Sequence, residues 1–172
     1  MTPDELLQNL LRYDRASLAD LAGFARSSPA DALRISWTFL SSAGREGHVL
    51  AGYCEEAIAV MHQLMGKEAF ERTLVAKWDG LGDHARANIC YGAMNHPTLI
   101  STDCALKLWG HERTSWGDRF SLLENLVVNR SARGLDKAFI FRWCDELLNT
   151  AHVEEKGRAE LFVMKVVEDL ES

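Results

Sequence analysis

Apolar residues recur at intervals of three and four over most of this sequence, and that spacing limits the fold more than any other feature. It is clearest in residues 48–65, where Glu55, Glu56 and His62 point away from the apolar face. This spacing gathers apolar side chains on one side of an α-helix, whereas a half-buried strand would alternate apolar and polar residues. Strict alternation never extends beyond about five residues. The chain is therefore predicted to be all-α.

Capping residues and glycines mark where the predicted helices begin and end. Thr2, Pro3 and Glu5 form a capping box with proline in the first turn, and residues 28–31 repeat this pattern. Gly66 ends another helix. The connections are short and leave no linker for a second domain, so residues 1–172 are predicted to form one all-α domain. After the N-terminal helix, further helices are expected near residues 28–42, 48–65, 67–78, 83–95, 102–110, 117–129, 135–149 and 153–170.

Four of the five tryptophans are regularly spaced along the chain. The intervals between Trp37, Trp78, Trp109 and Trp143 are 41, 31 and 34 residues. The segments DALRISW and DCALKLW both place an aspartate six residues before the tryptophan, and a turn and another apolar helix follow each tryptophan. A two-helix unit repeated in this way predicts stacked helical hairpins that form a short α-solenoid. An irregular helical bundle is the alternative, because so few tryptophans can be evenly spaced by chance.

The hairpin period and segments such as GLGDHARANICYGAMNHPTL resemble HEAT or armadillo-type repeats over roughly residues 28–170. The proline and aspartate–arginine pattern typical of those repeats is not regularly present. The resemblance therefore implies a class of fold and not a particular activity. In size and acidity the chain also resembles small bacterial immunity proteins, which neutralise a toxin domain by covering it.

The four cysteines are spaced 36, 14 and 40 residues apart and include no C-x-x-C pair. This spacing argues against a zinc site and a disulfide framework, and it favours reduced thiols. The N-terminal segment has neither the basic start nor the apolar core of a signal peptide, and no apolar run approaches transmembrane length. A cytoplasmic protein is expected.

The negative charge is concentrated near the C-terminus. Residues 1–143 carry 16 basic and 17 acidic side chains, whereas residues 144–172 carry three basic and eight acidic ones. An acidic surface repels phosphate and attracts basic surfaces, so a protein partner is expected, and neither nucleic acid nor membrane. The alternative is a solvated helix face that has no partner.

The residues 101–116 contain side chains that carry out chemistry elsewhere, but their spacing argues against a catalytic site. Cys104 and His111 lie two helical turns apart, about 10 Å of rise, which is too far for a hydrogen-bonded nucleophile and base. Asp79, Asp83 and His84 share a loop and are a weak candidate for a divalent ion. No catalytic residue, metal site or cofactor is therefore predicted.

The sequence predicts a non-enzymatic protein-binding module, expected to be an immunity-type inhibitor that blocks a basic toxin domain such as a nuclease. Acidic side chains would cover the basic active site, and tryptophan is favoured at such contacts. The alternative is a HEAT-like nucleic-acid-binding protein or a small helical enzyme that uses the arginines between 113 and 142. The residues expected to bind the partner are Trp116, Asp145, Glu146, Glu154, Glu155 and Glu160.

Overall fold

The computed structural model describes residues 1–42, 48–93 and 99–171. Within these ranges the chain is helical and contains no strand, which confirms the all-α prediction. The end of the helix expected at 83–95 lies partly outside the described residues. The helices are α1 (Pro3–Leu11), α2 (Ala16–Ser27), α3 (Pro29–Ser41), α4 (His48–Met65), α5 (Lys67–Lys77), α6 (Asp83–Asn88), α7 (Thr102–Trp109), α8 (Trp116–Val128), α9 (Arg130–Arg133), α10 (Lys137–Thr150) and α11 (Val153–Glu171).

The helix ends follow local side-chain chemistry. Thr2 and Glu5 form the expected capping box, and Ser115 and Asp118 form a second one at the start of α8. Ser101 caps α7 by accepting a hydrogen bond from the Cys104 amide, and Asp136 caps α10. Ser28 differs from the prediction, because its hydroxyl donates to the Asp31 carboxylate and makes no bond to the helix backbone.

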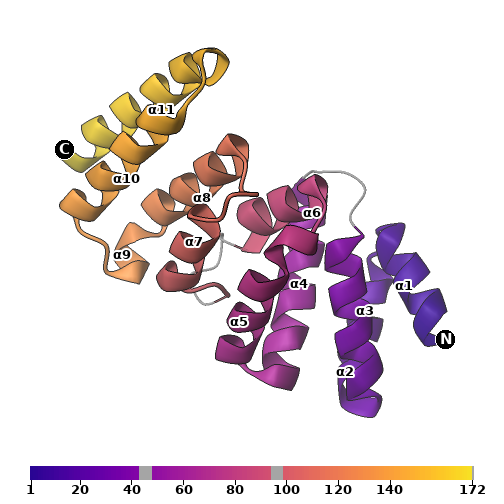
Figure 1. Ribbon diagram of the computed structural model, residues 1–172. Helices are drawn as coiled ribbons and strands as arrows, with labels where there is room; N and C mark the ends of the chain where they lie inside the picture. Colours follow the sequence, from indigo (N-terminus) through magenta and orange to yellow (C-terminus); the bar gives the residue numbers. More distant parts are fainter. Residues whose placement is uncertain (43–47, 94–98, 172) are drawn as a thin grey trace.

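The helices form an elongated row that follows the order of the chain (Figure 1). The termini lie at opposite ends, with α1–α3 at one end, α4–α8 between, and α10 and α11 at the other. Contacts join helices that are near in sequence, such as α3 with α4 and α10 with α8 and α11. The accessible surface of 9051 Å² somewhat exceeds the roughly 8,500 Å² typical of a monomer of this mass, as an elongated shape requires.

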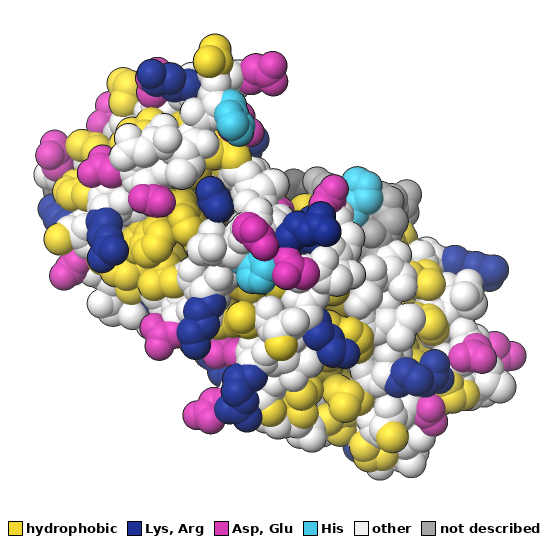
Figure 2. All heavy atoms as spheres, in the orientation of Figure 1, with side chains coloured by type: hydrophobic (Ala, Val, Ile, Leu, Met, Phe, Trp, Pro, Cys, Tyr) yellow, Lys and Arg dark blue, Asp and Glu magenta, His cyan; other side chains and the backbone are white. Residues whose placement is uncertain are grey.

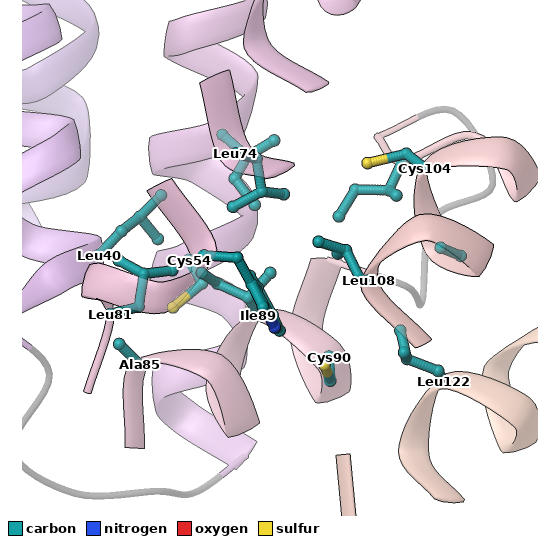
Figure 3. Packing of buried hydrophobic residues seen from close by; sticks show 14 of the residues in the cluster. Leu40, Cys54, Leu74, Leu81, Ala85, Ile89, Cys90, Cys104, Leu108 and Leu122 are labelled. Carbon is teal, nitrogen blue, oxygen red and sulfur yellow. The ribbon is translucent and has the colours of Figure 1, made fainter. Parts of the chain in front are cut away.

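Buried hydrophobic residues form one continuous cluster from Leu6 to Leu170. Figure 3 shows its central part, where Cys54 and Ile89 lie beside Leu81, and Leu108 lies between Cys104 and Leu122 of α8. No disulfide contributes, because all four cysteines are free and buried. The stability of this row therefore comes from the packing of apolar helix faces against their neighbours.

Side-chain hydrogen bonds connect segments that lie 30 to 40 residues apart. Trp78 Nε1 donates to Thr114 Oγ1 at 2.8 Å, 36 residues further along the chain. Similar bonds join Asn125 to the Cys90 carbonyl and Arg133 to the Ile100 carbonyl. Trp109 and Trp143 meet edge to face with ring centroids 5.0 Å apart. These contacts connect neighbouring parts of the row. We interpret this pattern as stacked hairpins of a short α-solenoid.

Candidate functional site

The hairpin of α10 and α11 forms the C-terminal end of the row (Figure 1). Helix α11 packs against α10 through an inner face that includes the buried Ala159, Val166 and Leu170. Phe162 extends this contact to α8, where its ring centroid lies 4.9 Å from that of Phe120. Arg158 covers the same ring, with its guanidinium carbon 4.1 Å from the centroid. The inner face of α11 is therefore fully engaged within the protein.

The opposite side of α11 carries exposed apolar side chains. Val153 is 92% exposed, Leu161 69% and Met164 59%. They are three of the five large hydrophobic residues that are exposed in the described part of the chain. At 3.6 residues per turn they point away from the inner face, and Gly157 lies between them. Burial inside this protein does not account for this second apolar stripe.

The charges around this stripe have one sign. On a helical wheel, Glu154, Glu160, Glu168 and Glu171 all lie within about 70° of the mean direction of the three exposed apolar residues. Lys156, Arg158 and Lys165 lie more than about 80° from that direction. We call this surface the outer face of α11: Val153, Glu154, Gly157, Glu160, Leu161, Met164, Glu168 and Glu171. On the C-terminal end of the molecule as a whole, Figure 2 shows hydrophobic, acidic and basic side chains together.

The residues that the sequence predicted to bind a partner differ in exposure and lie on more than one helix. Glu154 and Glu160 are exposed on the outer face of α11, and Asp145 and Glu146 are exposed on α10. Glu155 is half-buried, and its carboxylate accepts a hydrogen bond from the His152 amide at 3.0 Å. It therefore serves the start of α11 as well as adding to the surface charge.

Trp116 does not lie on the surface as a contact residue would. Its side chain is only 9% exposed, and Nε1 donates to the Leu147 carbonyl at 3.3 Å. Its ring centroid lies 5.4 Å from that of Phe120, which is one helical turn further along α8. The first turn of α8 thus directs Trp116 inward onto α10, so it belongs to the core and not to a binding surface.

Sequence reasoning missed the exposed apolar residues of α11. Phe162, Val163 and Val166 already account for the inward-facing apolar period of the helix expected at 153–170. Leu161 and Met164 can nevertheless be recognised from the sequence, because both fall on the polar side of the helical wheel.

The arginines of residues 113–142 are largely used inside the protein. Arg119 donates to the Trp109 carbonyl, Arg130 to the Val127 carbonyl and Arg133 to the Ile100 carbonyl. Each of these bonds closes a helix end or joins two helices. Arg113 and Arg142 are exposed on separate elements. These positions do not form the continuous cationic surface that the nucleic-acid alternative requires.

A groove of about 860 Å³ lies between α5 and α7. The Glu71 carboxylate spans it, accepting bonds from the amide of Ser101 at 2.6 Å and from its hydroxyl at 2.8 Å. The start of α7 is thus already occupied by an internal carboxylate. The remaining charges of the groove are mixed in sign: Lys67, Glu68, Arg72, Asp103 and Lys107.

The Cys104 thiol forms part of the wall of this groove but is not an activated nucleophile. It is 2% exposed, and burial together with the nearby Glu71 carboxylate raises its pKa to about 12. A thiol must ionise to attack, so Cys104 stays protonated and unreactive at neutral pH. His111 lies beside Asp79, with Nδ1 3.3 Å from Oδ1.

In the part of the chain that the structure describes, no group of three or more His, Cys, Asp or Glu side chains is placed to hold a metal ion. Among the same residues, no helix is both long and apolar enough to cross a membrane. Comparisons with protein-family models, with curated proteins and with solved structures find no match to this chain. The interpretation of the site therefore depends on its own geometry and charge.

Proposed function

We propose that this protein is a non-enzymatic binding module whose α10–α11 hairpin contacts a basic protein. The outer face of α11 carries the proposal, because it combines exposed Val153, Leu161 and Met164 with four glutamates. Exposed apolar residues grouped on one surface of a protein mark interaction sites more often than scattered ones do. A surrounding charge of one sign speeds encounter with an oppositely charged partner and disfavours others.

An immunity-type inhibitor is the specific role that we favour. A toxin that cleaves nucleic acid needs a cationic active site, and an acidic helical hairpin would cover that site and exclude the substrate. Inhibition would be steric and electrostatic and would require no catalytic residue. In the α5–α7 groove the Cys104 thiol is buried and the Glu71 carboxylate is engaged with Ser101, so neither is available as a nucleophile.

The test is co-expression with the proteins encoded beside its gene. One of them is expected to be toxic alone, to be neutralised by this protein and to form a complex with it that survives purification. Isothermal titration of the two purified proteins then gives the dissociation constant. We expect the double variant E154K/E160K to weaken binding roughly tenfold or more, with a steep dependence on salt.

The matched control is E112K/E124K, which changes the net charge equally at exposed acidic residues outside the hairpin. It should leave the dissociation constant within about twofold, since distant exposed charges are screened. If the two double variants weaken the complex equally, the hairpin is not the binding surface. If no neighbouring product is toxic or forms a complex, the inhibitor role is wrong.

A further inference from the structure

Helix α11 has apolar residues on two opposite sides, which is the pattern of a helix packed between two neighbours. The inner stripe contacts α10 and α8, and Val153, Leu161 and Met164 form the outer stripe. In stacked helical proteins, a helix side that no neighbouring helix covers is ordinarily polar, because it faces water. The outer face of α11 instead has the composition that would fit one more helix of the row.

The length and shape of the outer face suit a single helix. Residues 153–168 span roughly 22 Å at 1.5 Å per residue, about four helical turns. Gly157 lies in the middle of the stripe, and a Cβ atom built on it would meet nothing within 4 Å. A partner backbone can therefore approach α11 closely there, between Val153 and Leu161.

The charge of the outer face determines which side chains a helix bound to it must carry. Four glutamates lie beside the apolar stripe, and the three basic residues of α11 lie on its flanks. A second copy of the same face would bring eight glutamates together, and an anionic membrane surface would be repelled by them. A helix with lysine or arginine on both sides of an aliphatic stripe satisfies both the apolar contacts and the charges.

We propose that the outer face of α11 binds a basic amphipathic α-helix, which packs along it as the next helix of the row. This inference rests on the proposed function and adds the structure that the partner presents at the contact. For a contact of this size, with three large apolar side chains on this protein, we expect a dissociation constant on the order of micromolar.

The test uses three synthetic 18-residue peptides and the full-length protein, with binding measured by fluorescence anisotropy. The first peptide carries leucine at three-and-four spacing and lysine elsewhere, the second has the same composition in scrambled order, and the third replaces lysine with glutamate. We expect the first to bind at micromolar concentration, the scrambled peptide to bind at least tenfold more weakly, and the glutamate peptide not to bind. Amide NMR shifts on adding the first peptide should be concentrated in residues 153–168.

Gly157→Gln supplies the decisive variant. It fills the gap in the outer face without changing charge, and glutamine favours a helix more than glycine does, so α11 remains folded. This variant should weaken binding of the first peptide at least tenfold. Gly52→Gln is the matched control, because Gly52 is exposed in α4 and also has open space around its Cβ position. It should have no effect.

The inference is overturned if the patterned and scrambled basic peptides bind equally, or if Gly157→Gln and Gly52→Gln behave alike. Equal binding of the two basic peptides, lost in E154K/E160K, would leave the acidic hairpin as a binding surface but exclude helix docking. If E154K/E160K abolishes the natural complex but no peptide binds, the acidic hairpin is likewise a binding surface and helix docking is excluded. The co-expression experiment tests the proposed function independently of these peptide measurements.

Discussion

At the scale of single residues, the cysteines show that the environment of a side chain decides whether it is reactive. Cys54, Cys90, Cys104 and Cys144 are each at most 2% exposed. Burial raises the pKa of Cys54 and Cys104 to about 12 and of Cys144 to about 11, and raises that of Cys90 well above its ordinary value. Their role is to fill the core as small apolar groups.

These raised pKa values predict a loss of stability in alkali. In the unfolded chain the thiols ionise near their ordinary pKa of 9.0, whereas in the folded protein they remain protonated up to pH 11 to 12. Their contribution to the free energy of unfolding is therefore complete below about pH 9 and decreases as the pH rises toward 12. Each thiol contributes a slope of up to about 1.4 kcal/mol per pH unit. Urea unfolding followed by circular dichroism between pH 7 and 10 measures this decline.

The control for this prediction is Cys104→Ala, which removes one buried thiol and leaves Cys54, Cys90 and Cys144 in place. Its stability should decrease less steeply above pH 9 than that of the wild type, although it is lower at pH 7. Equal slopes would mean that groups other than the Cys104 thiol cause the alkaline loss.

Trp78 is the tryptophan with the largest structural role. It is fully buried, and its Nε1 donates to Thr114 Oγ1 at 2.8 Å, while Trp37 is only half-buried beside Lys77. Trp78→Phe removes a buried bond and leaves unfilled volume, so the free energy of unfolding should fall by roughly 2–3 kcal/mol. Trp37→Phe should cost less than about 1 kcal/mol. Equal losses in urea unfolding would contradict the role assigned to Trp78.

Residue types alone predicted part of the candidate site. The charge imbalance located Glu154 and Glu160 correctly on an exposed helix face, because acidic side chains avoid the interior. Trp116 was placed wrongly, since a tryptophan at a helix start can turn outward or inward and only its neighbours decide. Ser101 caps α7, although the repeated segment DCALKLW begins at Asp103, because the cap depends on the exact residue at which the helix begins.

At the scale of elements, the sequence predicted most of the helices, because most have their own apolar period and end signals. The bounds of α4, α5, α7 and α10 differ from expectation by two residues or fewer. Helix α2 (Ala16–Ser27), the short α9 and the π-helical turn at Ile89–Ala93 were not anticipated. The last two are too short to show a period, and they depend on packing against neighbouring helices.

Two glycines in the C-terminal third should respond oppositely to alanine. Gly157 lies within α11 in ordinary helical conformation, so Gly157→Ala should raise the free energy of unfolding by about 0.5–1 kcal/mol. Gly134 follows α9 with a φ of +66°, where a Cβ is strained, so Gly134→Ala should lower it by about 1 kcal/mol. Thermal unfolding of both variants gives the comparison. Destabilisation by Gly157→Ala would show that α11 does not have the regular helical geometry described.

At the scale of the whole molecule, the all-α class followed from periodicity, whereas the order of packing did not. The tryptophan intervals of 31 to 41 residues resemble the 30 to 40 residues spanned by hydrogen bonds such as Glu71–Ser101 and Tyr53–Tyr13. That similarity arises if each hairpin bonds to the next one. Four tryptophans give only three intervals, so their spacing alone cannot distinguish such a pattern from chance.

A row held by contacts between neighbours should tolerate the loss of its last helix. Ending the chain after Thr150 removes α11, whose contacts are with α10 and, through Phe162, with Phe120 of α8. Residues 3–128 keep their own core, including the Trp78–Thr114 bond, so they should remain folded and unfold cooperatively. The helical circular-dichroism signal should fall only by the share of α11 and a frayed α10, and the free energy of unfolding by roughly 3 kcal/mol or more, because buried Ala159, Val166 and Leu170 are lost. A shortened chain without cooperative unfolding would show instead that the helices depend on one another across the whole molecule, as in an irregular bundle.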